Sequence, residues 1–374
     1  MNIVIAPDSF KECLSAEKVA NNIEKGILKV IPKATIVKIP ISDGGEGLLE
    51  ALVKPTGGYL ISVEVKDPLN RTIKTSYGIL GDGTTAIIEM AKASGLELLK
   101  KSERNPLITS TFGTGQLILN ALNRGCSKII IGLGGSATND GGTGMIKALG
   151  GKFLEKNNDE ISEGGGALSK LYRIDISGID NRLSHCKIIA ACDVSNPLTG
   201  PKGASFVFGG QKGGNTKTLA QLDKNLSHYV AVILSDLRID VDAIPGSGAA
   251  GGMGAALSAF FKASLISGID LIIGHLHLEE YIKNADLVIT GEGKIDTQTL
   301  HGKTVLGLAS IAKKFKVPVI VIAGTMGNDI EKIYGFGVTS VFSIINKPME
   351  LSEAIEQADI LLQNCVENIM RLIK

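Results

Sequence analysis

The sequence has no tryptophan, only 11 prolines, and an odd number of cysteines. The five cysteines are scattered without a Cys-x-x-Cys pair: Cys13, Cys126, Cys186, Cys192 and Cys365. This pattern argues against both a disulfide framework and a zinc ribbon. We therefore expect reduced thiols that mostly pack in the interior.

Long apolar runs are also missing. The longest candidates, such as VPVIVIAG (317–324), have the length of a buried strand and fall short of the ~18 residues that a membrane span needs. At the N-terminus, MNIVIAPDSFK has no basic region before its short apolar stretch, so we expect a first strand and not a signal peptide. These absences predict a cytoplasmic protein with no membrane partner.

An excess of charge of either sign is absent too, because 39 Lys and Arg face 38 Asp and Glu. No long-range positive field would draw such a protein to nucleic acid or to an anionic membrane. We therefore expect small-molecule partners and no nucleic acid. A homo-oligomer is compatible with the sequence, which does not determine the oligomeric state.

Glycine, in contrast, is abundant: 46 of the 374 residues, well above the average share of about 7%. The glycines gather at 44–47, 132–151, 164–166, 200–214, 246–254 and 291–293. Glycine weakens the interior of helices and strands, but it is tolerated where the chain turns sharply or comes close to a ligand. The clusters therefore indicate segments where the backbone turns sharply or packs closely against a neighbouring group such as a ligand.

The two ends of the chain alternate apolar strands with amphipathic helices. Strands are predicted at 2–6, 35–40, 285–291, 317–324 and 337–344, and helices at 15–30, at 304–315, after Gly47 and from Ser352. Apolar strands separated by such helices predict a parallel sheet covered on both faces.

The middle of the chain has a different texture. Residues 59–89 contain three strand-like runs at short spacing, which favour hairpins or a mixed sheet. The simplest organisation is one α/β domain built from 1–59 plus 285–374, with a second α/β domain inserted at 60–284 that carries the glycine-rich loops. We expect the active site in the cleft between the two domains, a common place for small-molecule sites.

The stretch KIIIGLGGSATNDGGTG (128–144) has the layout of a phosphate loop: a buried strand, several glycines, and a helix that starts near Gly142 and could turn its positive end toward an anion. It does not match the Walker A pattern. A G-x-G-x-x-G at Gly246, Gly248 and Gly251 follows DAIP and not an apolar strand, so a tight turn into a packed helix is favoured over a dinucleotide site.

Acidic residues stand among the glycines, several of them just after predicted strands: Asp8, Asp43, Glu46, Asp140, Asp193, Glu292 and Asp296. The carboxyl ends of parallel strands are where open α/β sheets bind ligands. Each acid taken singly could equally serve a turn or a helix cap. Together with Lys11, Lys202, Lys212, Lys294 and Lys303, however, they supply the parts that phosphoryl transfer uses.

Six motifs in order resemble the bacterial glycerate kinase family, the type without a P-loop. They are APDSFKECLSA (6–16), PISDGGEG (40–47), GLGGSATNDGGTGM (132–145), ACDVSNPLTGPKGASFVFGGQKG (191–213), PGSGAAGGMGAAL (245–257) and TGEGKIDTQTLHGK (290–303). The resemblance covers essentially the whole chain. It departs slightly at Cys13, Gly210 and Lys294, the last standing where Arg is frequent.

The resemblance implies an ATP- and Mg²⁺-dependent kinase of D-glycerate, usually acting at the 2-hydroxyl to give 2-phosphoglycerate and ADP. It also implies two α/β domains, a flavodoxin-like parallel-sheet domain built from both chain ends and an inserted mixed one. Three alternatives stay open: phosphorylation of the 3-hydroxyl, a kinase of another short hydroxy acid, and a non-catalytic sugar-acid or nucleotide sensor. The balanced charge and the absence of an appended DNA-binding segment speak against the sensor.

The roles of individual residues are hypotheses from chemistry. Backbone N–H groups of the 132–142 loop would cradle the ATP phosphates at Gly134, Gly135, Ser136, Asn139 and Asp140. Glycerate would be held by Asp8, Ser9, Lys11, Asp43 and Glu46, with Lys11 at its carboxylate.

Lys294 is a further candidate for substrate binding, where it offers a point charge in place of a bidentate fork. Asp193 is predicted to be the general base or a Mg²⁺ ligand, and Asp296 a second metal ligand. The sequence leaves open which carboxylate is the base and which ones bind metal.

Overall fold

The computed structural model describes residues 1–10, 13–41, 47–296, 299 and 303–374, without the side chain of Lys303. Two compact units are present. Unit 1 comprises Met1–Asp43, Glu50–Pro55 and Ser267–Lys374, and unit 2 comprises Gly44–Leu49 and Thr56–Ile266.

Unit 1 has a parallel sheet whose described strands follow the order β13-β12-β11-β1-β2. The strands are β1 (Asn2–Ile5), β2 (Thr35–Lys38), β11 (Leu287–Ile295), β12 (Val319–Met326) and β13 (Ser340–Ser343). Numbered within the unit, this order is 2-1-3-4-5, which is the flavodoxin-like order. The prediction of a flavodoxin-like domain is confirmed, and its topological switch point lies between β1 and β11.

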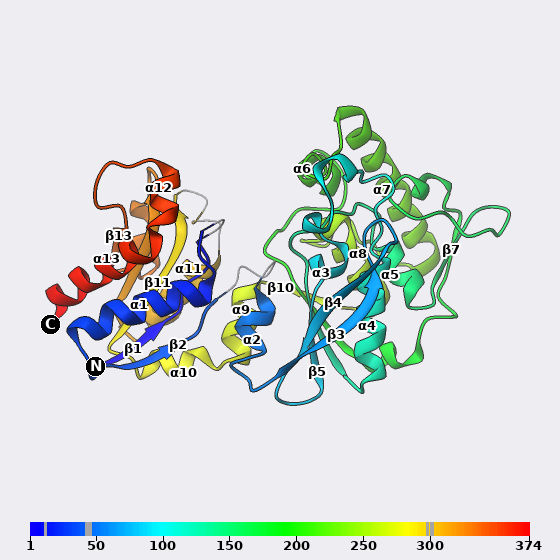
Figure 1. Cartoon of the computed structure of the whole chain (residues 1–374). Coiled ribbons are helices and arrows are strands. Elements are labelled where there is room, and N and C mark those ends of the chain that lie inside the picture. Colours follow the sequence, from blue (N-terminus) through cyan, green and yellow to red (C-terminus); the bar gives the residue numbers. More distant parts are fainter. Residues whose placement is uncertain (11–12, 42–46, 297–298, 300–302) are drawn as a thin grey trace. The chain divides into compact units, whose positions relative to one another are not determined.

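Helices α1 (Ala16–Val30) and α13 (Ala358–Ile373) pack against each other on one face of this sheet (Figure 1). Ile23 of α1 and Val366 of α13 share a buried cluster with Ile5 of β1. The helix α1 starts as predicted, since the Ser15 hydroxyl accepts a hydrogen bond from Lys18 N (3.3 Å).

The other face of the sheet is covered as well. Val4, Val288 and Val321 alternate with the residues of that cluster and are equally buried. The helix α11 (Lys303–Lys314) contacts β11 and β12, and it packs against α9 (Gly268–His275) and α10 (Leu278–Lys283). The remaining helices near the chain ends are α2 (Leu48–Leu52), α12 (Leu351–Glu356) and η6 (Glu331–Phe336).

Unit 2 has a mixed sheet with the order β10-β9-β6-β5-β4-β3. Its strands are β3 (Tyr59–Lys66), β4 (Thr72–Ile79), β5 (Thr85–Glu89), β6 (Lys128–Gly132), β9 (Lys187–Ala191) and β10 (Ser264–Ile266), and a separate hairpin joins β7 (Lys152–Leu154) to β8 (Arg173–Asp175). The first three strands pair antiparallel and the others parallel, which confirms the mixed sheet predicted for this region.

The helices of unit 2 are α3 (Ala91–Ser94), α4 (Phe112–Asn123), α5 (Thr143–Ala148), α6 (Ala204–Phe208), α7 (Thr216–Leu237) and α8 (Met253–Phe261). Short 3-10 turns are η1 (Leu96–Leu98), η2 (Lys101–Glu103), η3 (Ala167–Lys170), η4 (Asn181–Ser184) and η5 (Ala249–Gly251). Within the described part of the chain, no helix combines the length and the apolar character that a membrane crossing requires.

The parallel strands of unit 2 end in register at one edge of the sheet. Gly132 at the end of β6 lies opposite both Glu89 of β5 and Ala191 of β9. Ile266 of β10 lies opposite Ala191 on the other side. The loops that follow these strands therefore start side by side.

Gly26 allows α1 and α13 to pack closely, and its replacement tests that packing. A Cβ atom at this position would lie 2.7 Å from Val366 Cβ and 2.8 Å from the Gln363 carbonyl. We expect Gly26→Ala to lower the free energy of unfolding by about 1–3 kcal/mol in urea denaturation. Gly274→Ala is the matched control, because nothing lies within 4 Å there, and it should raise stability by up to about 1 kcal/mol. Equal stability of Gly26→Ala and the parent would contradict this close packing.

Candidate active site

The glycine-rich loop after β6 (residues 133–142) lies at the edge of the unit 2 sheet where the parallel strands end. Gly135, Gly141 and Gly142 adopt φ angles of +70°, +66° and +77°, which side chains disfavour. One side of the loop is paired, because Leu96 N donates to Gly135 O (2.8 Å) and Ala137 N donates to Ser94 O (2.9 Å).

The backbone N–H groups at the start of this loop stay unpaired. Among the described residues, no acceptor lies within hydrogen-bond reach of the amides of Gly134, Gly135 and Ser136, and the same holds for those of Asn139 and Asp140. Gly134 and Gly135 are half-buried and Ser136 is buried. Adjacent unpaired amides of this kind form a concave anion site, so this part of the loop fits a phosphate group.

The Asp140 carboxylate is fully buried and accepts hydrogen bonds from Thr111 and from the start of α5. Its Oδ2 accepts from Thr111 N (2.8 Å), Thr111 Oγ1 (2.7 Å) and Gly144 N (3.2 Å), and its Oδ1 accepts from Gly142 N (3.1 Å). Burial raises the pKa of this carboxyl, while the Thr111 bonds act the other way.

A helix does begin near Gly142, as predicted, since Gly142 is the N-cap residue of α5. The expectation that its positive end faces a bound anion stays a prediction. In the structure the Asp140 carboxylate occupies that end, because it accepts from the N-cap amide of Gly142 and from the Gly144 amide in the first turn of α5.

The Asn139 side chain points into the interior and is fully buried. Its Nδ2 donates to Ser205 Oγ (3.0 Å). Its Oδ1 and the neighbouring Thr138 Oγ1 are buried without a partner among the described residues.

The G-x-G-x-x-G segment packs against this loop and its neighbour. A Cβ atom at Gly251 would lie 2.0 Å from Thr138 O, and one at Gly248 would lie 2.2 Å from Pro197 O. The segment leads through η5 into α8. These contacts agree with the expected tight turn into a packed helix.

Lys212 reaches the loop from the turn between α6 and α7. Its side chain is buried, and Nζ donates to Ser136 Oγ (2.7 Å) and to Thr138 O (2.7 Å). Burial lowers the pKa of this lysine to about 7, although nearby Asp140 acts in the opposite sense. The sequence pattern groups Lys212 with the lysines that could neutralise charge and does not single it out as a site residue.

Asp193 stands at the same edge of the unit 2 sheet, two residues beyond β9. The strand end is fixed there, since Leu133 N donates to Ala191 O (3.1 Å) and Cys192 N donates to Ile266 O (2.8 Å). The structure therefore brings Asp193 and the glycine loop to one edge, with the Asp193 side chain half-buried.

Asp8 and Ser9 lie in the segment after β1, beyond Ala6 and Pro7, at the switch point of the unit 1 sheet. Asp8 N donates to Gly291 O (2.8 Å), and Asp8 Oδ1 accepts from Ser9 N (2.6 Å). The Asp8 side chain is buried at this position. Both residues lie where a flavodoxin-like sheet binds its ligand.

Lys294 and Asp296 occupy the far end of β11 and the residue that follows it. Lys294 Nζ lies 2.9 Å from Asp296 Oδ2, with the lysine side chain largely exposed. Thr299 Oγ1 accepts from Asp296 N (3.1 Å) and donates to Glu292 Oε1 (2.6 Å). This network joins four polar residues at the end of β11 in unit 1.

Three predicted substrate residues, Lys11, Asp43 and Glu46, lie outside the described residues. Near them in the chain, the amide of Leu49 donates to Oε1 of Glu89, a buried acid at the end of β5 (3.1 Å). Glu89 escaped the sequence reasoning, although it directly follows the apolar run TAII, as the selected acids follow theirs. It therefore joins the candidate site residues of unit 2.

The predicted metal ligands belong to different units, Asp193 to unit 2 and Asp296 to unit 1. Within the described ranges, no group of three or more His, Cys, Asp or Glu side chains could hold a metal. Mg²⁺ usually takes one or two carboxylates together with substrate phosphates and waters. The donor type therefore fits Mg²⁺, and the ligand set stays a prediction.

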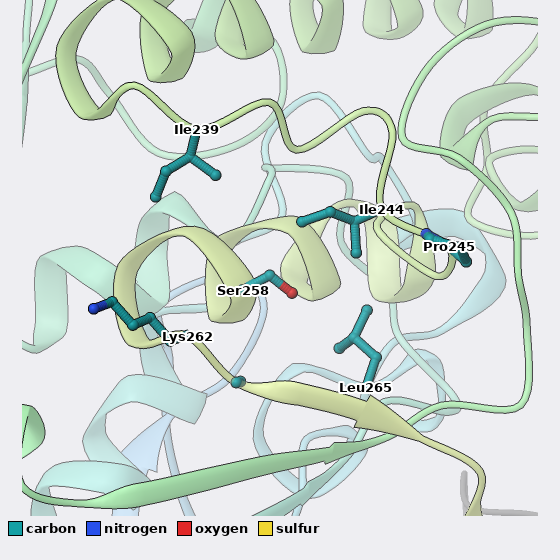
Figure 2. Close-up of a pocket in the computed structure, with 7 residues that line it drawn as sticks. Ile239, Ile244, Pro245, Ser258, Lys262 and Leu265 are labelled. Carbon is teal, nitrogen blue, oxygen red and sulfur yellow. The ribbon is translucent and has the colours of Figure 1, made fainter.

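A separate pocket in unit 2 has a volume of about 530 Å³ (Figure 2). Its walls are mostly apolar: Ile239, Ile244, Pro245, Ser258, Lys262, Ala263 and Leu265. This set contains none of the site residues predicted from the sequence. The pocket is thus distinct from the glycine loop in its lining.

Unpaired loop amides, a buried lysine against them and carboxylates at strand ends are features of phosphate-binding α/β proteins. A model of the glycerate kinase family matches residues 3–374. The chain belongs to the glycerate kinase family, and it is a kinase.

Individual relatives span nearly the whole chain. Glycerate 2-kinase of Escherichia coli strain K12 is 52% identical over 358 residues, which cover 96% of this chain and 94% of the relative. Glycerate kinase of Bacillus subtilis strain 168 is 49% identical over 374 residues, covering 100% and 98%. A crystal structure of a Salmonella typhimurium LT2 protein assigned as glycerate kinase 2 superposes with a TM-score of 0.89 at 48% identity, covering 100% of this chain and 98% of that one.

Asp140→Asn tests the buried carboxylate of the loop. In the asparagine variant an NH₂ group would replace one carboxylate oxygen and would face N–H and O–H groups that now donate to that oxygen. We therefore expect the free energy of unfolding to fall by about 1–3 kcal/mol. The control is Asp159→Asn, whose exposed carboxylate accepts one side-chain bond from Asn157 (2.7 Å) and should change stability by less than about 0.5 kcal/mol. Urea denaturation of both variants gives the comparison, and similar losses would contradict this role of Asp140.

Proposed function

We propose that the protein transfers the γ-phosphoryl group of ATP to the 2-hydroxyl of D-glycerate, giving 2-phosphoglycerate and ADP. The observation that carries the proposal is the glycine loop, whose unpaired amides adjoin a buried lysine at the end of β6. The choice of substrate and hydroxyl is supported by the relative named glycerate 2-kinase, which is 52% identical to this chain.

In this proposal the ATP phosphates bind to the amides of Gly134, Gly135 and Ser136. Phosphate oxygens accept well from adjacent backbone N–H groups, and the Ser136 hydroxyl adds a further donor. Asn139 and Asp140 contribute through their amides, while their side chains hold the loop from within.

Glycerate is proposed to bind at the switch point of unit 1. Asp8 and Ser9 would accept from and donate to its hydroxyl groups, together with Asp43 and Glu46, and Lys11 would pair with its carboxylate. The exposed Lys294 would supply a second positive charge once the substrate draws it from Asp296. A lysine there holds a carboxylate less rigidly than a bidentate arginine would.

Asp193 is proposed to accept the proton of the attacking hydroxyl. The glycerate 2-oxygen forms a bond to the γ-phosphorus, the bond between that phosphorus and the β–γ bridging oxygen breaks, and ADP leaves with the electron pair. Asp193 and Asp296 are the residues that would hold Mg²⁺. When bound, Mg²⁺ neutralises the charge that develops on the phosphate oxygens.

Several expectations from the sequence stay predictions. They are the domain limits at residues 59 and 284, an active site in a cleft, the cytoplasmic location and a homo-oligomeric state. Phosphorylation of the 3-hydroxyl and of other short hydroxy acids remain the competing reactions, and the first experiment below separates them from the proposed one.

The reaction itself is tested by ADP release with ATP, Mg²⁺ and a panel of short hydroxy acids. We expect D-glycerate to give the highest kcat/KM, because its carboxylate and two hydroxyls match the lysine and the acids assigned to it. Phosphorus NMR of the product should show a phosphate on a secondary carbon, coupled to one carbon-bound proton. A product coupled to two protons would assign the 3-hydroxyl, and preference for another acid would overturn the choice of substrate.

Asp193→Asn should lower kcat by about 10²–10⁴-fold, since an amide cannot accept the hydroxyl proton. Steady-state rates at two Mg²⁺ concentrations separate the two roles given to this residue: excess Mg²⁺ partly restores a lost metal ligand but not a lost base. The control is Asp240→Asn, an exposed acid of the same unit. A kcat of Asp193→Asn within a few fold of the parent would exclude both roles.

A further inference from the structure

Lys212 is held rigidly by the turn that carries it. Lys212 N donates to Gly209 O (3.1 Å), and Gly214 N closes the turn on the same carbonyl (3.0 Å). Gly213 has a φ of +93°, and a Cβ atom there would lie 2.2 Å from Arg104 O. The backbone of this turn therefore has little freedom, so the Cα atom from which the Lys212 side chain extends is held in place.

A lysine is a costly choice if the only task is to hold the loop. Burying an amine disfavours its charged form, and a neutral side chain or a backbone contact would fill the same space more cheaply. Toward the described residues the Lys212 amine also uses only two donors, on Ser136 Oγ and Thr138 O. An ammonium has three, so the charged form has one more to offer.

The geometry at Ser136 gives the buried amine a route to a ligand. Lys212 Nζ donates a hydrogen bond to Ser136 Oγ. The Ser136 O–H group is therefore not needed for this contact and can donate to another acceptor. Ser136 belongs to the same run as the unpaired amides of Gly134 and Gly135. A phosphate oxygen bound by those amides would also accept a hydrogen bond from the Ser136 hydroxyl.

We propose that Lys212 is a positioning residue for nucleotide phosphate: it orients the Ser136 hydroxyl from behind the glycine loop and becomes an ammonium when the phosphate binds. The inference rests on the proposed use of ATP. It concerns a residue that touches the loop and not the reacting atoms, and it adds a proton-linked step to phosphate binding.

The groups around the amine define the expected pH dependence. Asp140 is the acidic neighbour and raises the pKa of Lys212, whereas burial lowers it to about 7. On the adjoining segment, Arg104 donates to Gln211 O (3.3 Å), and on α7 the phenol of Tyr229 stays protonated because burial raises its pKa. An incoming phosphate adds negative charge, so it raises the pKa of Lys212 and draws a proton onto the amine.

The sign of the effect follows. Above pH 7 the free protein holds a mostly neutral Lys212, and binding has to take up a proton, so the affinity for ATP falls as the pH rises. We expect the KM for ATP to increase by up to tenfold per pH unit between pH 7.5 and 9.5. The γ-phosphate of ATP is fully ionised in this range and adds no titration of its own.

The test compares the parent enzyme with Lys212→Met and Ser136→Ala, with Lys217→Met as an exposed control on the first turn of α7. Titration calorimetry with Mg²⁺ and β,γ-imido-ATP in two buffers of different ionisation enthalpy measures proton uptake. At pH 8 we expect an uptake approaching one proton for the parent and for Lys217→Met, and none for Lys212→Met.

Steady-state kinetics supply a second readout. Lys212→Met should raise the KM for ATP about 10- to 100-fold at pH 7.5, remove its dependence on pH, and change kcat less than KM. Ser136→Ala keeps the lysine and should raise the KM for ATP by a smaller factor. It carries the test if Lys212→Met does not fold.

Folding of the variant is checked by urea unfolding at pH 7 and 9. A lysine with a lowered pKa binds more protons when unfolded, so the parent should gain stability between these values, and Lys212→Met should lack that gain.

Unchanged proton uptake and an unchanged KM profile in folded Lys212→Met would overturn the inference while leaving the kinase assignment intact. So would a loss confined to kcat. A parent enzyme that binds no nucleotide would instead contradict the proposed function, and the inference with it.

Discussion

A buried carboxylate has to find all of its hydrogen-bond donors nearby, and the glycine loop is shaped by that requirement at Asp140. The loop must turn so that Thr111, Gly142 and Gly144 converge on two oxygen atoms. The N-terminal end of α5 and the N-cap of α4 are thereby both hydrogen-bonded to one side chain. With these donors directed inward, the remaining amides at Gly134–Ser136 stay free for an external anion.

Glycines allow the neighbouring loops to pack directly against the backbone of this loop. Gly165 and Gly251 lie so close to the backbone at Asn139 and Thr138 that a Cβ atom would come within 2.4 Å and 2.0 Å of a carbonyl oxygen. Three backbone segments thus meet without side chains between them. The abundance of glycine that first suggested ligand contact serves the mutual packing of loops at least as much.

Much of the fold could be predicted from residue patterns, because apolar strands and amphipathic helices alternate clearly at both chain ends. The position of β1 beside β11 could not, since the paired residues Ile3 and Leu287 are about three quarters of the chain apart and only the family resemblance implied the strand order. Asp140 was assigned to phosphate, yet its letters in TNDGG do not reveal which way its side chain points. Lys212 escaped selection because its partner Ser136 lies 76 residues away and no local spacing links them.

The place of the lysine distinguishes this loop from a Walker A site. There the lysine belongs to the loop itself and reaches the phosphates as an exposed point charge. Here it comes from another segment and donates to Ser136, and burial lowers its pKa to about 7; in the proposed role a bound anion would offset the cost of charging it. A permanent cation in the same place would weaken the folded state without ligand. An amine that loses its proton in the free protein avoids this loss of stability, but its binding of phosphate then depends on pH. Burial of the amine explains both the neutral form and the pH dependence.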